Sequence, residues 1–418
     1  MVECKRCLYT SDHPLGITFN DDGICSGCLI HEEKDSLDWD SRLNDLKKLI
    51  SQYRSSKSKY DCIVPVSGSR DSYFILHTVI NTLKLKPLVV SYNKYFNTNI
   101  GIENLANLRI KFNVDFQIKN VNPNTVKKIT RKSLYQFGNP YWHCIAGETV
   151  FPVQTAVMMK IPLIIWGAHQ GLEQTGMFSH LHNVEMSRRY RKDHDLFGHD
   201  TDNFITDFDD LDDEDMLNYK YPAFSDIESV GVRGIYLGNF IRWDTYAQHK
   251  KMVEMYGYKG AKFSRTFDAY DNADSFVYSD LHDILKLYKH GYSKVTDQAC
   301  REIRFGRISK KNAVKIVNFY ERQMPNFIDL FSDWLGTNNH SLQFALNRHR
   351  NEKYWNQISP DKWIFKKSIA NQEIPNLRKL TYPNSKELQN GDEKNSYITI
   401  GKGVNWPKKY KRKQPEWV

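Results

Sequence analysis

Four cysteines near the start of the chain have the spacing of a metal site. Cys4 and Cys7 form one Cys-x-x-Cys pair, and Cys25 and Cys28 form a second pair after 17 intervening residues. Each pair makes a tight turn that points its two thiolates in one direction, so both pairs can converge on one tetrahedral ion. Four sulfur ligands leave no open coordination position, which favours a structural zinc over a catalytic one. Four unrelated buried cysteines are the alternative, and the paired spacing argues against it.

A serine- and glycine-rich turn joins an apolar segment to the start of a helical pattern. It reads Ser67-Gly-Ser-Arg-Asp-Ser72 and follows Ile63-Val-Pro-Val66. The first backbone amides of a helix lack partners and carry partial positive charge, so such a turn can bind a phosphate group. The Ser67 and Ser72 hydroxyls and the Arg70 guanidinium would add donors, while Asp71 would cap the helix or hold Mg²⁺. An ordinary capped turn is the alternative, and no GxxxxGK[ST] phosphate loop occurs in the chain.

Two other stretches carry residues suited to acid–base chemistry. His143 would act as a general base or position a substrate amide, and Cys144 beside it would line the pocket. His169 follows an apolar run that ends at Trp166, so His169 and Glu173 would face the crevice at the end of a strand. Burial at a helix start is the alternative for the first pair of residues, and a surface loop is the alternative for the second.

Three arginines recur at three-residue spacing in the second half of the chain, Arg301, Arg304 and Arg307. A guanidinium grips a carboxylate or a phosphate with two parallel hydrogen bonds, so these residues are candidates for binding a sugar carboxylate or a nucleotide diphosphate. Solvent-facing positions on a helix are the alternative.

Apolar strands alternate with amphipathic helices from Tyr60 onward. Strands are expected at 62–66, 87–92, 115–118 and 162–167, and helices at 71–82, 99–112 and 123–137. This alternation predicts an α/β fold with a parallel sheet covered by helices on both faces. Ligands of such sheets bind beyond the carboxyl ends of the strands, which is where the Ser67–Ser72 turn and His169 lie.

The net charge of +10 is unevenly distributed. The last 17 residues hold six lysines and arginines against one glutamate, so half of the excess lies in a terminal stretch rather than on a folded face. Such runs are mostly solvated, and we expect no nucleic-acid partner. The longest apolar run, near Ile161 to Trp166, is far too short to span a bilayer, and the first residues lack the apolar stretch of a signal peptide. We therefore expect a cytoplasmic protein.

The Ser67–Ser72 turn resembles the SGGxDS signature of the PP-loop ATP pyrophosphatases, with Gly68 in place and Ser69 where that family usually has glycine. Further stretches narrow the resemblance to the N-acetyl sugar amidotransferases of bacterial surface-polysaccharide synthesis. These stretches keep one order over roughly residues 1 to 355: the Cys-x-x-Cys pairs, Tyr60-Asp-Cys-Ile-Val-Pro-Val-Ser67, Tyr92-Asn93, Phe96-Asn-Thr98, Trp142-His-Cys144, Ala146-Gly147, Phe151-Pro-Val-Gln154, Pro162-Leu-Ile-Ile-Trp-Gly167 and the helical stretch from Leu281 to Lys315.

The resemblance implies a parallel-sheet domain like that of the adenine nucleotide alpha hydrolases, with ATP and Mg²⁺ as cofactors. It implies that Ser67 to Ser72 hold the pyrophosphate of ATP and that Tyr92 and Gly167 help to bind the nucleotide. Members of the family convert the acetamido group of a sugar to an acetamidino group through adenylation and attack by ammonia. No glutaminase segment is recognisable in this chain, so the resemblance implies separate glutaminase and barrel-type subunits like those of imidazole glycerol phosphate synthase.

Five segments follow from these observations together. We expect a zinc knuckle at 1–36, a linker helix at 37–59, a PP-loop ATP-binding domain at 60–244, a helical C-terminal domain at 245–355, and a basic, polar tail at 356–418. A stretch at 200–215 is rich in Asp and Glu, which favours a solvated insertion at the surface of the ATP-binding domain.

Two other functions stay open on the sequence. A tRNA-modifying PP-loop enzyme would adenylate a base carbonyl and install sulfur or nitrogen, although the basic excess of this chain is concentrated at its end. The second alternative function is a zinc-knuckle scaffold that no longer turns over ATP. This hypothesis stays open because Ser69 departs from the family's loop. Conversion of ATP to AMP that depends on an N-acetyl sugar would separate all three.

Overall fold

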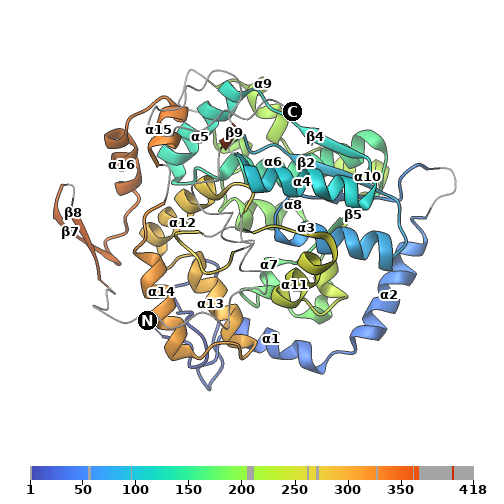
Figure 1. The fold of residues 1–418 in the computed structure, drawn as a ribbon, viewed down its shortest axis with the longest axis horizontal. Coiled ribbons are helices and arrows are strands. Elements are labelled where there is room, and N and C mark those ends of the chain that lie inside the picture. The colour runs from blue at the N-terminus through green and yellow to red at the C-terminus, as the bar shows by residue number, and fades with distance from the viewer. Residues whose placement is uncertain are drawn as a thin grey trace.

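A parallel sheet forms the centre of the molecule. The computed structural model describes residues 2–54, 58–95, 97–204, 211–260, 263–269, 273–325, 328–360, 362–366 and 398–399. In this part of the chain the sheet consists of β1 (Cys62–Pro65), β2 (Pro87–Tyr92), β4 (Phe116–Lys119), β5 (Leu163–Trp166) and β6 (Arg233–Tyr236). Their order is β4-β2-β1-β5-β6, and all are parallel (Figure 1). The predicted α/β fold is confirmed, and the direction of strand addition reverses between β1 and β5, where such sheets bind ligands.

Neighbouring residues of each central strand pack into different cores. Ile63 of β1 lies level with Leu88 of β2 and Ile164 of β5, and all three are buried on one face of the sheet. Val64 and Val89 are buried on the other face. A strand that is buried on both faces must be apolar at every position, which explains the continuous Val, Ile and Leu runs of the sequence.

Helices cover both faces of the sheet. The face that includes Ile63 lies under α6 (Trp142–Met159) and α10 (Phe224–Val230). The opposite face is covered by α2 (Trp39–Ser51), α3 (Arg70–His77), α4 (Asn99–Phe112) and α11 (Thr245–Tyr256). After α3 the chain continues as a π-helical turn over Thr78–Thr82. Both faces are thus removed from water, as a parallel sheet requires.

The second half of the chain forms a helical layer beside the sheet (Figure 1, yellow to orange). Its helices are α12 (Phe276–His290), α13 (Lys294–Arg304), α14 (Lys310–Glu321), α15 (Ile328–Leu335) and α16 (Asn339–Asn347). Three of them, α12, α15 and α16, enclose with α5 (Pro123–Phe137) and α6 a core in which Trp142, Tyr278 and Trp334 are fully buried, while α13 and α14 pack on each other in a separate cluster. The predicted helical C-terminal region is confirmed. Among the described helices, none combines the length and apolar character that crossing a membrane needs.

The N-terminal residues form a cysteine-bearing knuckle that leads into α1 (Ser26–Ser36). In Figure 1 this segment (blue) lies beside α13 and α14, at the edge of the helical layer. Tyr9 donates a hydrogen bond to Asp297 of α13 at 2.7 Å, and Lys310 of α14 donates to the carbonyl of Cys4 at 2.6 Å. The N-terminal knuckle is therefore in direct contact with the helical layer.

Short elements complete the described chain. They include β3 (Asn97–Thr98), which pairs with β9 (Ile398–Thr399), α7 (Gln170–Glu173), α8 (Arg188–Tyr190), α9 (Asp213–Met216), and the hairpin of β7 (Trp355–Ser359) and β8 (Lys362–Phe365).

Several elements are not predicted by the sequence, among them α6, β6 and the β7–β8 hairpin. Most of α6 is buried, so its apolar residues do not follow the one-sided pattern of a surface helix. β6 has only four residues, one of them Gly234. The β7–β8 hairpin lies in the segment expected to be a polar tail, where the rings of Trp355 and Phe365 pack 4.9 Å apart.

The acidic stretch at 200–215 is only partly a surface insertion. Residues 205–210 lie outside the described part of the chain. Before them, Asp200, Thr201 and Phe204 are buried, and the Phe204 ring packs 4.3 Å from that of Trp142. The expectation of a solvated insertion is therefore wrong for these first residues, because one aromatic side chain anchors them in the core.

Candidate functional site

The Ser67–Ser72 turn joins β1 to α3 at the carboxyl edge of the sheet. Gly68 has φ +79, and a Cβ at this position would lie 3.0 Å from the carbonyl oxygen of Gly101. Only glycine adopts such a conformation without a steric cost. Ser69 has φ −86 and ψ −176, ordinary extended backbone, and is the N-cap residue of α3. The serine that departs from the SGGxDS pattern therefore stands where glycine's backbone freedom is not needed.

The serines of the turn hold one another in place. Ser67 Oγ donates to Ser69 Oγ at 2.7 Å, and the Ser67 amide donates to Ser72 Oγ at 3.2 Å. Asp71 lies in the first turn of α3, with Oδ1 3.5 Å from Nε2 of the buried His249 on α11. Hydroxyls and helix-start amides suit a phosphate, and a carboxylate beside them suits a divalent cation that the phosphate carries.

This turn opens on a cavity of about 600 Å³. Sites for small organic ligands have volumes of about 300–1,000 Å³, so the cavity has room for a nucleotide and part of a second substrate. Its walls come from three parts of the chain: the sheet domain (Ser67, Asp71, Lys94, Glu148, Trp166, His169, Glu173), the helical layer (His282, Lys286, Lys294, Asp297, Arg301) and the knuckle (Leu15).

Six residues that the sequence singled out line this cavity: Ser67, Ser69, Asp71, His169, Glu173 and Arg301. Gly68 and Ser72 belong to the same turn and shape it from within. Gly167 follows β5, and a Cβ there would lie 2.8 Å from the Ile75 side chain, so glycine allows close packing of α3 on the strand end. The side chain of Arg70 lies outside the described part of the structure.

His169 presents one ring nitrogen without a partner. Its Nδ1 accepts a hydrogen bond from the Gly171 amide at 3.0 Å, and its Nε2 has no hydrogen-bond partner among the described residues. The rings of Tyr190 and Tyr236 lie 4.2 and 4.6 Å away. Burial, with His194 nearby, lowers the pKa of His169 to about 4, so the imidazole is neutral at physiological pH. A neutral ring whose Nδ1 accepts has a donor at Nε2.

Tyr92, His143 and Cys144 do not reach the cavity. His143 is fully buried, with Nδ1 3.0 Å from the Tyr92 hydroxyl and Nε2 3.4 Å from the Cys144 sulfur. Burial lowers the pKa of His143 to about 3 and raises the pKa of the Cys144 thiol well above its ordinary value. The structure thus brings these three residues together behind the cavity wall, apart from the Ser67–Ser72 turn.

The three arginines of the helical layer have different surroundings. Arg301 lines the cavity and pairs with Asp268 at 3.0 Å. Arg304 donates to the Gln174 carbonyl at 2.8 Å, and Arg307 pairs with Glu302 at 3.1 Å. The alternative interpretation, that these arginines face solvent on a helix, is therefore wrong for all three.

Sequence reasoning missed several charged residues of the cavity, Lys94 and Glu148 among them. Lys94 follows β2 by two residues, and a charged side chain directly after a fully buried strand was the available signal. Glu148 lies within α6, whose buried pattern gave no helix periodicity, so its orientation was not predictable.

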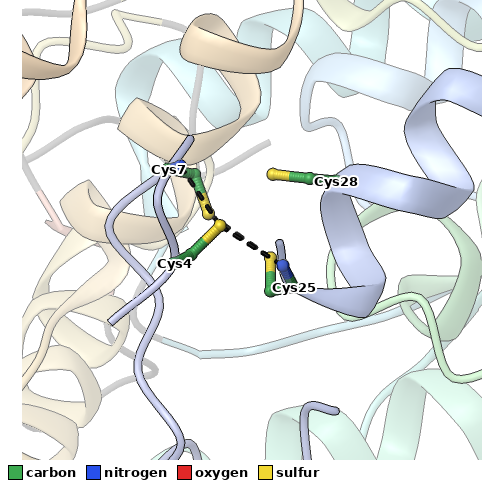
Figure 2. Close-up of side chains that lie close together, drawn as sticks. All are labelled: Cys4, Cys7, Cys25 and Cys28. Carbon is green, nitrogen blue, oxygen red and sulfur yellow. Dashed lines mark hydrogen bonds between the residues drawn. The ribbon is translucent and has the colours of Figure 1, made fainter. Parts of the chain in front are cut away.

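The four N-terminal cysteines form a compact cluster (Figure 2). All four thiols are buried and lie within 4.8 Å of one another, with 3.5 Å between the sulfurs of Cys7 and Cys25. Sulfurs around one tetrahedral zinc are about 3.8 Å apart when each Zn–S bond is about 2.3 Å. The Cys4 sulfur also accepts hydrogen bonds from the amides of Arg6, Cys7 and Cys25. Such donors stabilise a thiolate, so the cluster fits a bound metal ion.

The knuckle is attached to the cavity wall by buried charges. Arg304 lies with Nη2 4.0 Å from the Cys25 sulfur while it donates to the Gln174 carbonyl. Lys34 of α1 pairs with Glu173, the last residue of α7 and part of the cavity lining. The cysteine cluster therefore positions a segment that encloses the site, although the cluster lies outside the cavity itself.

Fold and site together define an α/β protein with a serine- and glycine-rich turn, of a chemistry suited to phosphate, at the switch point of its sheet. Part of the helical half is similar to a known family: residues 255–369 match the family described as "LPS biosynthesis protein WbpG-like, C-terminal domain". That region includes α12, α13 and their cavity-lining residues.

Two further comparisons cover smaller shares of the chain. An uncharacterized protein, MJ1599 of Methanocaldococcus jannaschii, is 27% identical over 119 residues, which are 28% of this chain and 43% of that protein. The chain thus matches less than half of that relative's length. Among solved structures, an NH3-dependent NAD synthetase from Campylobacter jejuni in complex with nitrate is similar over 34% of this chain and 62% of that chain, with 14% identity and a TM-score of 0.28.

We expect the purified protein to carry one metal ion per chain at the cysteine cluster. Cys28→Ser should abolish binding and lower the unfolding temperature, because the binding energy of such an ion is coupled to folding. Cys62→Ala, which removes a buried thiol from β1, should keep full metal content. Elemental analysis and thermal unfolding measure both, and equal metal content in the two variants would contradict the assignment.

A second prediction compares two neighbours in the turn. Gly68→Ala should destabilise the protein by about 1–2 kcal/mol, because alanine pays the left-handed backbone cost that glycine avoids. Ser69→Ala should cost less, since its backbone is extended and only its side-chain hydrogen bond is lost. Urea unfolding of both variants gives the two free energies of unfolding. An equal or larger loss of stability in Ser69→Ala would show that a side chain at position 68 causes no backbone strain.

Proposed function

We propose that this chain is an ATP-dependent amidotransferase that converts the acetamido group of an N-acetyl sugar, carried on a nucleotide, to an acetamidino group during surface-polysaccharide synthesis. One observation carries the proposal: the Ser67–Ser72 turn and the helical layer that matches an LPS biosynthesis family line the same cavity. A phosphate-binding turn accounts for ATP, and the family match supports a sugar substrate.

The chemistry requires activation because an amide oxygen is a poor leaving group. Attack of this oxygen on the α-phosphate of ATP forms an O-adenylyl imidate and releases pyrophosphate. The first-turn amides of α3, with the Ser67 and Ser69 hydroxyls, would hold the pyrophosphate, and Asp71 would hold Mg²⁺. Bound Mg²⁺ neutralises the charge that develops on the phosphates. The main task of the chain is therefore to position the two reactants and to stabilise charge.

Cationic side chains of the helical layer suit an anionic sugar carrier. Lys286, Lys294 and Arg301 line the same cavity as the turn. Each is paired with an aspartate of the same layer, Lys294 with Asp280 at 2.7 Å. Such pairs fix the cations in place, so a carboxylate or diphosphate would bind to a preorganised surface rather than to mobile side chains.

Ammonia would come from outside this chain. A glutaminase needs an accessible thiolate, whereas Cys144 and Cys300 are fully buried and burial raises the pKa of Cys144. We therefore propose separate glutaminase and barrel-type subunits as partners. We also propose zinc as the ion of the four-cysteine cluster, with a structural role, because four thiolates form a closed tetrahedral site.

The central test follows turnover and product together. With ATP and ammonium, the wild type should form AMP only when a nucleotide-linked N-acetyl sugar is present, and mass spectrometry should show the exchange of one oxygen for NH. Asp71→Asn and Ser67→Ala should lower this turnover by at least about 100-fold, since each removes a group that stabilises the reacting phosphates. Asp226→Asn, a matched change on the exposed surface of α10, should leave turnover unchanged. Near-normal rates in both turn variants would mean that the turn is structural only.

Nitrogen supply gives a separate prediction. The isolated chain should use ammonium, with rates that rise with pH as free ammonia becomes more abundant, and should not use glutamine. Adding a glutaminase and its barrel subunit should restore glutamine use at neutral pH. Amidine formation from glutamine by the purified single chain would refute the need for these partners.

A further inference from the structure

Three ionisable side chains form a buried cluster in the cavity wall, apart from the residues predicted for the site. Lys94 Nζ lies 2.7 Å from Asp274 Oδ2 and 2.8 Å from Glu148 Oε1, and it donates to the Tyr141 hydroxyl at 2.7 Å. The three donors of the ammonium group thus face two hydrogen-bond acceptors, Asp274 and Tyr141, and one ion-pair partner, Glu148. Lys94 therefore holds Glu148 in place and is not available to a phosphate.

Glu148 is the member of the cluster that reaches the cavity. The side chains of Lys94 and Asp274 are each 4% exposed, whereas that of Glu148 is 26% exposed and lines the cavity. Lys94 forms an ion pair with the buried Oε1 of Glu148, and Oε1 has no hydrogen-bond partner among the described residues. One carboxylate oxygen is thus held from behind by the ammonium group, and the exposed part of the Glu148 side chain faces the cavity.

The cluster stands beside the phosphate-binding turn. Pro65 of β1 lies level with Val90 of β2, so the turn and the residues that follow β2 leave the sheet side by side. The start of α4 separates them: a Cβ on Gly101 would lie 2.4 Å from the Asp274 Cα, while the Gly101 carbonyl faces Gly68. A group bound at Glu148 would therefore share the cavity with a phosphate held by the turn.

The charge of the cluster favours a small cation. Two carboxylates share one ammonium, and Oδ1 of Asp274 is buried with no partner among the described residues. The titratable groups that face Glu148 are Lys94, Asp274, Tyr141 and Cys144. Burial raises the pKa of Glu148 above its ordinary value, Asp274 adds to this rise, and Lys94 opposes it. The carboxylate is thus a stronger proton acceptor than an exposed glutamate.

We propose that Glu148 binds the ammonium ion that supplies nitrogen and accepts its proton. The proposal rests on the amidotransferase function. Ammonium gives one proton to the carboxylate, and the lone pair of the resulting ammonia forms the C–N bond to the imidate carbon. The C–O bond to the α-phosphate breaks, AMP leaves with that electron pair, and the product leaves as an amidinium ion. Glu148 then releases its proton to solvent, so that charge and atoms balance.

The test separates the two half-reactions in the full-length, metal-loaded protein. Sugar-dependent exchange of pyrophosphate into ATP reports adenylation, and AMP formation at varied ammonium reports nitrogen transfer. Glu148→Gln should keep exchange within a few-fold of wild type and lose at least about 100-fold in kcat/KM for ammonium at neutral pH, the size of a general-base contribution. Glu148→Asp should recover part of this loss. Glu103→Gln, which removes an exposed carboxylate of α4, should match wild type in both assays.

The pH dependence provides a second readout. In Glu148→Gln the rate should follow the concentration of free ammonia, rising tenfold per pH unit, whereas the wild type should rise less steeply because Glu148 deprotonates bound ammonium. The proposal is overturned if Glu148→Gln and wild type have equal kcat/KM for ammonium. It is also overturned if Glu148→Gln loses both pyrophosphate exchange and nitrogen transfer, because the defect would then not be specific to ammonium. A wild type that exchanges no pyrophosphate with any N-acetyl sugar overturns the amidotransferase function, and this proposal with it.

Discussion

A buried cation must be matched by acceptors, and three such cations determine how the parts around the cavity fit together. Lys34 joins the knuckle to Glu173 of the sheet domain, and Arg304 joins the helical layer to the same segment. Lys94 joins the end of β2 to α6 and to Asp274, at the start of the helical layer. Loss of one partner of a buried ion pair costs about 3–5 kcal/mol, so these contacts leave little freedom for the domains to shift. The cavity is consequently a fixed junction of three segments.

The parts of this architecture that depend on local pattern could be predicted from the sequence. The central strands β1, β2 and β5 are short apolar runs between helices, and their parallel arrangement follows from the alternation. The four cysteines were predictable because their spacing within two short turns brings them together. The turn at Ser67–Ser72 was predictable for the same reason, since a strand, a glycine and a helix start are adjacent in the chain.

Other features could not be predicted because they depend on contacts between distant segments. Glu148 and Asp274 meet at Lys94 from positions 54 and 180 residues further along the chain, and nothing local indicates that they converge. The direction in which His143 points depends on burial of α6 on both sides, which removes the periodicity that would have revealed it. Ser69 is tolerated because the left-handed φ of the turn falls on Gly68 and not on Ser69. The sequence does not indicate which of the two residues takes this conformation.

The contact between the knuckle and α13 also bears on how the chain acquires its structure during synthesis. Tyr9 and Asp297 are separated by 288 residues, so the ribosome has made the whole sheet domain before the knuckle's docking surface exists. Long-range contacts of this kind form late and leave surfaces exposed in the meantime. An ion held by Cys4, Cys7, Cys25 and Cys28 needs only the first 28 residues, so it would keep the nascent N-terminus compact and its thiols unreactive until α13 emerges. In this view metal supply affects the yield of correctly assembled protein as well as its final stability.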